Sequence, residues 1–295
     1  MNNALVSILI PVYNRQDIVG ETIESALAQT YANTEIIIVD NCSTDNTWGI
    51  LERFENNNDQ IKIFKNDENL GPVLNWKRCI DEAKGEYAKI LFSDDLISEN
   101  FIEETLAFFD QDTAFVLSRI ACFQDDKKKH QLQFDHSGVI KREDYLNDIL
   151  LYNNLKFPVS PGNAIFRLKD LKTALEVDIV NELNLNFKTY GAGNDLLIYL
   201  NIANSYSSVK VSKEAISFFR RHRESFSISN NLLIYYDFSK YYFINLNFPK
   251  DLSKFKTILW LRGIRYKNRN KVIDLIDKRI NISFLLNVLI KKLLN

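Results

Sequence analysis

Two adjacent carboxylates, Asp94 and Asp95, end the apolar run YAKILFS at residues 87–93. Such a run is typical of a buried strand, and charges at its end are costly unless a cation meets them. Mg²⁺ and Mn²⁺ prefer oxygen ligands and neutralise paired acids. The pair therefore predicts a divalent-cation site, with capping of a helix that starts near Ser98 as the structural alternative.

The elements that must position these acids alternate in type along the first hundred residues. Short runs rich in β-branched residues occupy 4–12, 34–40, 61–65 and 87–93, and amphipathic helical patterns occupy 16–29, 44–56 and 72–83. Ser43 and Thr44 are expected to cap the second helix, and Pro72 to stand early in the third. Strands separated by helices at this spacing indicate right-handed βαβ units and a parallel sheet.

The loops after the first, second and fourth strands are polar and read PVYNR, DNCSTDNT and SDD. In a parallel α/β sheet, ligands bind beyond the carboxyl ends of the strands, so we expect these loops to converge on one crevice. The sequence has no GxGxxG after the first strand and no GxxxxGK[ST], GxSxG or HExxH motif. The chemistry is therefore expected to rest on carboxylates.

Composition narrows the class of protein further. Of the 295 residues, 46% are hydrophobic and 25% charged, as in a globular chain that can bury a sizeable core. The formal net charge is -1, but residues 251–295 carry 11 Lys and Arg against three Asp, a local +8 that leaves -9 for the rest. Three widely spaced cysteines without a CxxC pair indicate neither disulfides nor a zinc site, and fit a reducing cytoplasm. The N-terminal stretch MNNALVSILIPVYNR lacks the features of a signal peptide and of a membrane span.

Four stretches together resemble the motifs of family 2 glycosyltransferases. They are VSILIPVYNR, ALAQTYANTEIIIVDNCSTDNT, ENLGPVLNWKRCIDEAKGEYAKILFSDD and FRRHRESFS. The resemblance covers residues 5–230 and implies an α/β fold of the GT-A type, with a Rossmann-like, mostly parallel central sheet flanked by helices. It predicts a GT-A domain at 1–229, with a nucleotide-binding half near 1–97 and an acceptor-binding half near 98–229. A helical C-terminal extension is expected at 230–295.

The resemblance also implies a site for a nucleotide-diphosphate sugar at the strand ends. Asp40 is expected to accept hydrogen bonds from the uracil or ribose, although capping of the next helix would also favour Asp there. Pro11 and Tyr13 resemble the pair that lines the base pocket, and a buried tyrosine at a strand end is the simpler alternative. The further candidates for donor binding are Val12, Asn14, Asn75 and Asp94. For Asn75 the alternative is a polar residue on an exposed helix face.

By the same resemblance, Asp94 and Asp95 bind Mn²⁺ or Mg²⁺, and the metal assists departure of the nucleotide diphosphate. Which of the two acids is the ligand stays open, because the family's D-x-D pattern is changed here and Phe92 takes the place of its first acid. The basic cluster FRRHRESFS adds His222 as a candidate metal ligand and Arg220 and Arg221 as candidates for binding the diphosphate. A solvated basic strand end is the alternative for this cluster.

The resemblance also implies an inverting transfer, which needs one general base to take the proton from the acceptor hydroxyl. In the family this base is an acid at the start of a helix, after a glycine-rich loop. The segment TYGAGNDLLIYLNIA fits, with Asn194 in place of the first acid and Asp195 as the expected base. An aspartate favoured at a helix N-terminus by the macrodipole is the alternative. The QxxRW pattern of processive synthases is absent, so addition of a single sugar is expected.

Beyond residue 230 the pattern is helical, apolar and basic, as in helices that lie on an anionic membrane surface. A helical cap or a dimer face is the alternative. Together with this segment, the family resemblance implies a cytoplasmic enzyme, peripheral on the inner membrane face. It would move a sugar from a UDP-sugar to a lipid-linked or other glycan acceptor of a capsule or O-antigen. No nucleic acid partner is expected. The rival functions are a sugar nucleotidyltransferase, whose glycine-rich triphosphate loop is missing from PVYNRQD, and an inactive glycan-binding module.

Overall fold

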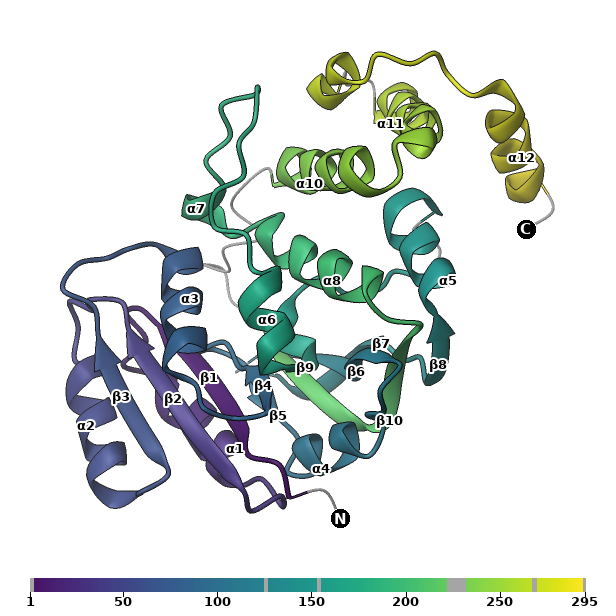
Figure 1. Cartoon of the computed structure of the whole chain (residues 1–295). Coiled ribbons are helices and arrows are strands. Elements are labelled where there is room, and N and C mark those ends of the chain that lie inside the picture. The colour runs from purple at the N-terminus through teal and green to yellow at the C-terminus, as the bar shows by residue number, and fades with distance from the viewer. Residues whose placement is uncertain (1–2, 125–126, 153–154, 222–231, 267–269, 294–295) are drawn as a thin grey trace.

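A mixed β-sheet forms the centre of the molecule (Figure 1). The computed structural model describes residues 3–124, 127–152, 155–221, 232–266 and 270–293. Within these residues the sheet has ten strands in the order β3-β2-β1-β4-β9-β6-β10-β5, with β7 paired to β6 and β8 to β10. The strands are β1 (Val6–Val12), β2 (Thr34–Asp40), β3 (Ile61–Lys65), β4 (Tyr87–Ile90), β5 (Leu96–Ile97), β6 (Thr113–Gln124), β7 (Lys127–Phe134), β8 (Gly138–Lys141), β9 (Ala164–Arg167) and β10 (Ser208–Arg220).

The first four strands pair in parallel, as predicted. β9 then lies antiparallel between β4 and β6, and β10 runs parallel to β6. The fourth strand is shorter than expected: it ends at Ile90 rather than at 93, and the chain leaves the ladder before the two acids. The carboxyl ends of β1, β2 and β4 therefore lie along one edge of the sheet.

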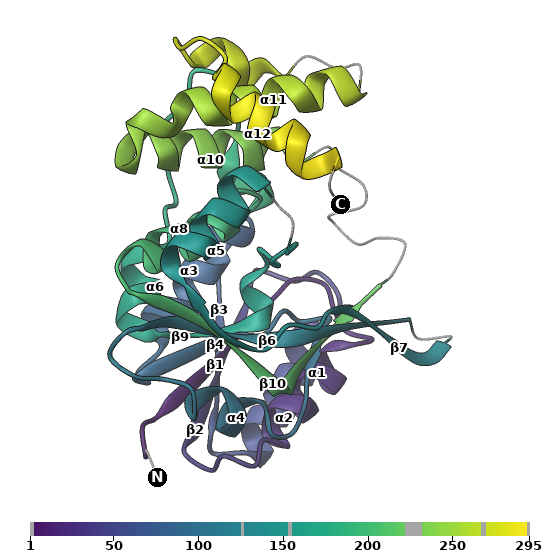
Figure 2. The ribbon, with the colours of Figure 1, turned by 90° about the vertical axis from the view of Figure 1, so that its right-hand side faces the viewer.

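Helices cover both faces of the sheet (Figure 2). On one side lie α1 (Val19–Leu27), α2 (Thr47–Asn57) and α4 (Phe101–Leu106), and on the other α3 (Pro72–Glu82), α6 (Leu168–Ala174) and α8 (Asn194–Asn204). Alternate residues of a strand point to opposite faces of the sheet. Ile8 and Ile10 therefore pack in the apolar core under α1, α2 and α4, and Leu9 packs in the core under α3, α6 and α8. Shorter elements complete this part: α5 (Arg142–Asn147), a π-helical turn (Asp148–Tyr152), a 3-10 turn (Pro161–Asn163) and α7 (Phe187–Tyr190).

The start of α2 differs from the prediction. The helix begins at Thr47 after Asn46, so Ser43 and Thr44 do not cap it, and both belong to the preceding loop instead. The prediction for α3 is confirmed: Pro72 is its first residue and follows Gly71, whose φ of +80° favours glycine.

The C-terminal segment forms a further helical layer over α8 (Figures 1 and 2). It consists of α10 (Leu233–Asn247), α11 (Leu252–Tyr266) and α12 (Ile282–Leu293), with 3-10 turns at Pro249–Asp251 and Lys271–Leu275. The predicted helical character is confirmed for the described part of this segment. Phe238 of α10 and Phe255 of α11 share one apolar cluster with Leu196 of α8. The domain boundary at 229 stays a prediction, because this cluster contains residues from both sides of it.

Candidate active site

The loops after β1 and β2 are joined by hydrogen bonds. The Asn14 backbone N–H donates to the Ser43 hydroxyl at 2.8 Å, and the Thr44 N–H donates to Asn14 Oδ1 at 2.8 Å. Asn14 adopts a φ of +51°, a conformation that Asn tolerates better than most residues. The Asn41 N–H also reaches the Val12 carbonyl at 2.9 Å. Two of the three polar loops thus converge as predicted.

Asp40, at the end of β2, is fully buried and holds its own loop. Its carboxylate accepts hydrogen bonds from the Ser43 N–H, at 3.1 and 3.3 Å, and from the Ser43 hydroxyl. Lys65 Nζ lies 3.9 Å away. The helix-capping alternative is wrong, because α2 begins only at Thr47. The predicted contact with the nucleoside stays a prediction.

The remaining donor-site candidates on these elements differ in exposure. Pro11 and Val12 are buried in β1, whereas Tyr13 is 39% exposed, so the alternative of a buried tyrosine is wrong. Asn75 is buried on α3: its Oδ1 accepts from Asn66 at 3.0 Å and its Nδ2 donates to the Val39 carbonyl at 3.2 Å. The exposed-face alternative for Asn75 is therefore also wrong, and its side chain ties α3 to β2.

Asp94 and Asp95 lie in a turn between β4 and β5. Asp95 is nearly buried, and its Oδ1 accepts the Arg220 backbone N–H at 3.0 Å. Arg15, from the loop after β1, places its guanidinium 3.9 Å from Asp94 Oδ2. Burial, together with the charge of Asp94, raises the pKa of Asp95 well above its usual range. Helix capping is excluded for both acids, because β5 follows them and α4 begins at Phe101.

Arg220 binds this acidic turn from the end of β10. Its Nε donates to the Asp94 carbonyl at 3.0 Å, its NH2 group lies 2.5 Å from Glu21 Oε2, and its guanidinium packs over the Phe123 ring. The side chain is almost fully buried, so it holds β10, the turn and α1 together. Arg221 follows and is exposed. Diphosphate binding by the two arginines stays a prediction, and His222 lies outside the described residues.

Sequence reasoning missed two cations near the acids, Arg15 and Lys89. Lys89 is fully buried in β4, donates a hydrogen bond to the Gly162 carbonyl and lies 4.5 Å from the centre of the Phe101 ring. Burial lowers the pKa of Lys89 to about 7, against the opposing effect of the Asp95 charge. The only available signal was a single lysine inside the apolar run YAKILF.

A divalent cation fits the acids only together with a ligand that brings oxygens of its own. Across the described residues no cluster of three or more His, Cys, Asp or Glu could hold a metal. Mg²⁺ is commonly bound by one or two carboxylates plus substrate phosphates, and Asp94 with Asp95 offers that set. Burial is the main cause of the raised pKa of Asp95, and the charge of Asp94 adds to it; a bound cation would oppose both effects.

Asp195 stands in the first turn of α8 and is nearly buried. Its Oδ1 accepts the backbone N–H groups of Gly193 at 2.8 Å and Leu196 at 2.7 Å. Its Oδ2 accepts the hydroxyl of Tyr236, on α10, at 2.8 Å. Burial raises the pKa of Asp195 to about 7, although these hydrogen bonds lower it. A carboxyl that titrates near neutral pH is suited to general base catalysis.

An aromatic pair joins the loop before Asp195 to the acidic turn. Gly191 has a φ of +67°, and a Cβ there would lie 2.5 Å from the Trp76 ring. Trp76 in turn packs on Phe92 with 5.6 Å between ring centroids, two residues before Asp94. The residue that replaces the first acid of the family pattern thus packs between the two halves of the site.

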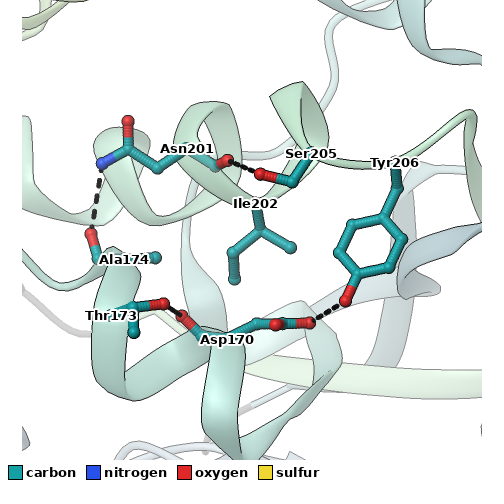
Figure 3. A pocket seen from close by; sticks show the side chains of 7 residues that line it. All are labelled: Asp170, Thr173, Ala174, Asn201, Ile202, Ser205 and Tyr206. Carbon is teal, nitrogen blue, oxygen red and sulfur yellow. Dashed lines mark hydrogen bonds between the residues drawn. The ribbon is translucent and has the colours of Figure 1, made fainter.

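A separate small pocket lies between α6 and α8 (Figure 3). It is lined by Asp170, Thr173, Ala174, Asn201, Ile202, Ser205 and Tyr206. Its volume of about 120 Å³ is below the range of roughly 300–1,000 Å³ typical of ligand sites. The Tyr206 hydroxyl donates to Asp170 at 2.6 Å inside it. The pocket lies toward the C-terminal end of α8, away from Asp195, and is too small for a nucleotide sugar.

One family model matches more than half of this chain, and relatives named as glycosyltransferases align with it. The profile described as Glycosyl transferase family 2 matches residues 7–174. TuaG of Bacillus subtilis, named for teichuronic acid biosynthesis, is 26% identical over 208 residues, which cover 70% of this chain and 82% of TuaG. WfaP of Escherichia coli, a UDP-Glc:alpha-D-GlcNAc-diphosphoundecaprenol beta-1,3-glucosyltransferase, is 39% identical over 111 residues. This second alignment covers 38% of this chain and only 43% of WfaP.

Solved structures show the same fold. S. aureus TarS in complex with UDP-GlcNAc superposes with a TM-score of 0.63 at 19% identity, covering 92% of this chain and 76% of that one. Mannosyltransferase PcManGT from Pyrobaculum calidifontis, in complex with GDP-Man and Mn²⁺, gives a TM-score of 0.53 at 14% identity, with 90% and 65% covered. The α/β fold of the GT-A type that the sequence predicts is confirmed.

Proposed function

Because the chain belongs to glycosyl transferase family 2, we propose that it moves one sugar, with inversion, from a nucleotide-diphosphate sugar to a hydroxyl group of a glycan. The observation that carries the inverting mechanism is Asp195, a buried carboxyl at a helix start whose pKa is raised to about 7. The glycosyltransferase activity itself follows from the family, and it sets aside both rival functions of the sequence analysis.

In the proposed reaction the acceptor hydroxyl attacks the anomeric carbon of the sugar from the side opposite the diphosphate. Asp195 takes the hydroxyl proton as the new bond forms, while the bond to the nucleotide diphosphate breaks. The base must be deprotonated to do so, and a pKa near 7 leaves a large fraction of it ionised at neutral pH.

The donor is proposed to bind across the ends of β1, β2 and β4. Tyr13 offers an exposed ring for stacking on the base, and Asp94 and Asp95 face the diphosphate with a bound Mn²⁺ or Mg²⁺. The metal would supply Lewis-acid stabilisation of the departing diphosphate. Arg15, 3.9 Å from Asp94, is a further cation at this edge.

A UDP-sugar is the proposed donor, since TarS was solved with UDP-GlcNAc and WfaP is named for UDP-Glc. A bacterial surface polysaccharide is the proposed product, because TuaG is named for teichuronic acid biosynthesis and WfaP for a diphosphoundecaprenol acceptor. Both statements concern those proteins, and for this chain they define what to test first.

A panel of nucleotide sugars tests the donor. Purified protein is incubated with UDP-, GDP-, dTDP- and CMP-sugars, and slow release of the nucleotide is measured, because many transferases hydrolyse their donor when no acceptor is present. We expect hydrolysis of one UDP-sugar and little of the others. Hydrolysis confined to a GDP-, dTDP- or CMP-sugar would replace the proposed donor. If no nucleotide sugar is hydrolysed, the panel is repeated with a glycan acceptor present.

We further propose that α12 rests on an anionic membrane surface. Phe284 and Val288 face the protein, while the opposite side of the helix exposes an apolar stripe of Ile282, Leu286, Leu289 and Ile290. The surrounding segment 251–295 carries the local charge of +8, which complements anionic lipid. In the described residues no helix is both long and apolar enough to cross a bilayer.

Vesicle sedimentation tests this contact with the full chain. Leu286→Glu combined with Ile290→Glu should reduce sedimentation with vesicles of phosphatidylglycerol at low salt. Val180→Glu is the matched control, since Val180 is also an exposed apolar residue but lies outside the C-terminal helices. Equal sedimentation of all three proteins would refute the membrane contact through this stripe.

A further inference from the structure

Helix α10 reaches the candidate base from the C-terminal segment, beyond the part of the chain that the family profile matches. Tyr236 and Asp195 are 41 residues apart, and the tyrosine hydroxyl donates to Asp195 Oδ2 at 2.8 Å. Tyr236 is half-buried and lies in a tyrosine-rich segment, LLIYYDFSKYYF, for which the sequence predicts only a helix. The contact joins the C-terminal layer to the catalytic centre.

Within the part of the chain that the structure describes, the hydrogen bonds of Asp195 leave one position for a proton. A carboxylate oxygen has two lone pairs, and on Oδ1 both are taken by the N–H groups of Gly193 and Leu196. Oδ2 accepts from the Tyr236 hydroxyl and, among the described residues, keeps its second lone pair. The acceptor's proton must therefore go to Oδ2, the oxygen that Tyr236 holds.

The rotation of α10 about its own axis is fixed next to Tyr236. Asp237 is fully buried, and its two oxygens lie 2.6 Å from Arg262 of α11 and 2.6 Å from Asn270. A Cβ at Gly193 would also clash with the Ser239 hydroxyl of α10 and with the Phe187 ring. The helix is thus packed directly on the loop that precedes Asp195, and it turns Tyr236 toward the base.

We propose that Tyr236 is a positioning residue for the catalytic base, and that its hydroxyl holds Asp195 Oδ2 so that the free lone pair faces the acceptor hydroxyl. This inference rests on the proposed function, since it takes Asp195 as the base. In the reaction the O–H bond of the acceptor breaks, the proton goes to Oδ2, and the Tyr236 proton stays on Tyr236.

The conservative variant Tyr236→Phe in the full chain tests the role. Loss of the donated hydrogen bond removes an interaction that favours the ionised carboxylate, so the pKa of Asp195 should rise. The titratable groups that interact with Asp195 include Tyr236 of α10 and Tyr199 of α8. We expect the acidic limb of the kcat profile to move up by about one pH unit, with unchanged affinity for UDP. Tyr241→Phe, on the same helix, should leave the profile in place.

A second measurement needs no substrate. With a folded pKa near 7 and an unfolded pKa near 3.8, Asp195 keeps its proton longer in the folded state, so it lowers the free energy of unfolding as pH rises from about 4 to 7. The stability of Asp195→Asn does not fall in this way, because asparagine does not titrate. The difference in the free energy of unfolding between parent and variant, measured against pH, therefore reports the pKa of Asp195. In the Tyr236→Phe background that difference should keep growing for about one further pH unit.

The outcomes separate this inference from the proposed function. If Asp195→Asn transfers sugar normally, Asp195 is not the base and the proposed mechanism fails. If Asp195→Asn is inactive but Tyr236→Phe leaves both the kcat profile and the stability titration unchanged, the positioning role alone is refuted. A shift in both readings with UDP affinity retained supports it.

Discussion

The proposed donor edge, formed by the loops after β1, β2 and β4, and the proposed base site around Asp195 are built in different ways. At the donor edge, loops from two successive strands bond to each other: Asn14 meets Ser43 and Thr44, and Asp40 holds Ser43. These partners follow β1 and β2 directly in the chain. At the base site, by contrast, Asp195 depends on Tyr236, and its preceding loop packs against Ser239 of α10 and Trp76 of α3.

The two parts of the site therefore depend on different elements of the chain. The donor edge needs the first two βαβ units and the turn that Arg220 holds from β10. Asp195, the proposed base, also needs the packing of α10 on α11, because Asp237 of α10 is held by Arg262 and Asn270. Substitutions that separate donor binding from proton transfer can therefore test the comparison directly.

The largest effect is expected from Asp195→Asn. The variant keeps an oxygen to accept from the Gly193 and Leu196 N–H groups but cannot take a proton. Loss of a general base lowers the rate by about 10²–10⁴. We expect sugar transfer to fall by at least about 100-fold with UDP affinity unchanged, as measured by steady-state kinetics and calorimetry.

Two results would contradict the assignment of Asp195 as the base. Loss of UDP affinity in Asp195→Asn would place Asp195 at the donor rather than at the acceptor. Near-normal transfer would move the base elsewhere, first to Glu182, which precedes the glycine-rich loop. As a control, Asp178→Asn changes an exposed acid that lies 2.5 Å from Lys188 and should leave the rate as it is.

Gly193→Ala should give the next largest effect, on stability. Gly193 has a φ of +90°, and an added Cβ would also lie 2.8 Å from the Phe187 ring and 3.0 Å from the Tyr235 carbonyl. Strain of this kind costs about 1–3 kcal/mol, and the clash with α10 adds to it. We expect the free energy of unfolding in urea to fall by about 2–4 kcal/mol, with a further loss of transfer rate.

Gly138→Ala provides the matched control for this change. Its φ is +103°, but a Cβ there would meet nothing within 4 Å. The two variants share the backbone strain and differ in the packing against α10. Equal losses of stability would mean that α10 does not pack tightly against the loop before Asp195. The contrast between the donor edge and the base site would then disappear.

The elements around the donor edge could be predicted from the sequence better than those around the base site, for a physical reason. Strand and helix periodicity is local, so β1 to β4 and α1 to α3 could be placed to within a few residues. The capping role of Ser43 and Thr44 was wrong, because both bond to the loop after β1, about 30 residues away. No prediction was made for β6, which pairs with β9 over a separation of about 50 residues.

Tyr236 shows the same limit more sharply. Four tyrosines, at 235, 236, 241 and 242, lie in one helical segment, and nothing local tells which of them meets Asp195. That choice depends on how Asp237 and Ser239 fix the rotation of α10. Lys89 could be noticed in its apolar run, but its contacts with Gly162 and Phe101 depend on β9 and α4 being in place.

The smallest of the three effects is expected at the donor edge, from Asp95→Ala. Asp95 accepts only the Arg220 backbone N–H among the hydrogen bonds described for its side chain, so its removal should leave the turn folded. A bound metal would lose one of its two carboxylates, and we expect the Mn²⁺-dependent gain in UDP affinity to fall by about ten-fold or more.

Asp95→Ala and Asp195→Asn are expected to affect different properties of the protein. Asp95→Ala should weaken donor binding in the presence of Mn²⁺ and should leave the stability titration of Asp195 unchanged, because the hydrogen bonds to the Asp95 side chain and those to the Asp195 side chain have different donors. Asp94→Ala should give a similar or smaller loss, since its side chain is more exposed. Asp81→Ala, an exposed acid on α3 paired with Lys77, should change neither reading. If Mn²⁺ raises UDP affinity equally in the parent and in Asp95→Ala, the metal is bound elsewhere. The acidic turn would then be a structural junction between β4, β5 and β10, with Arg220 as its main contact.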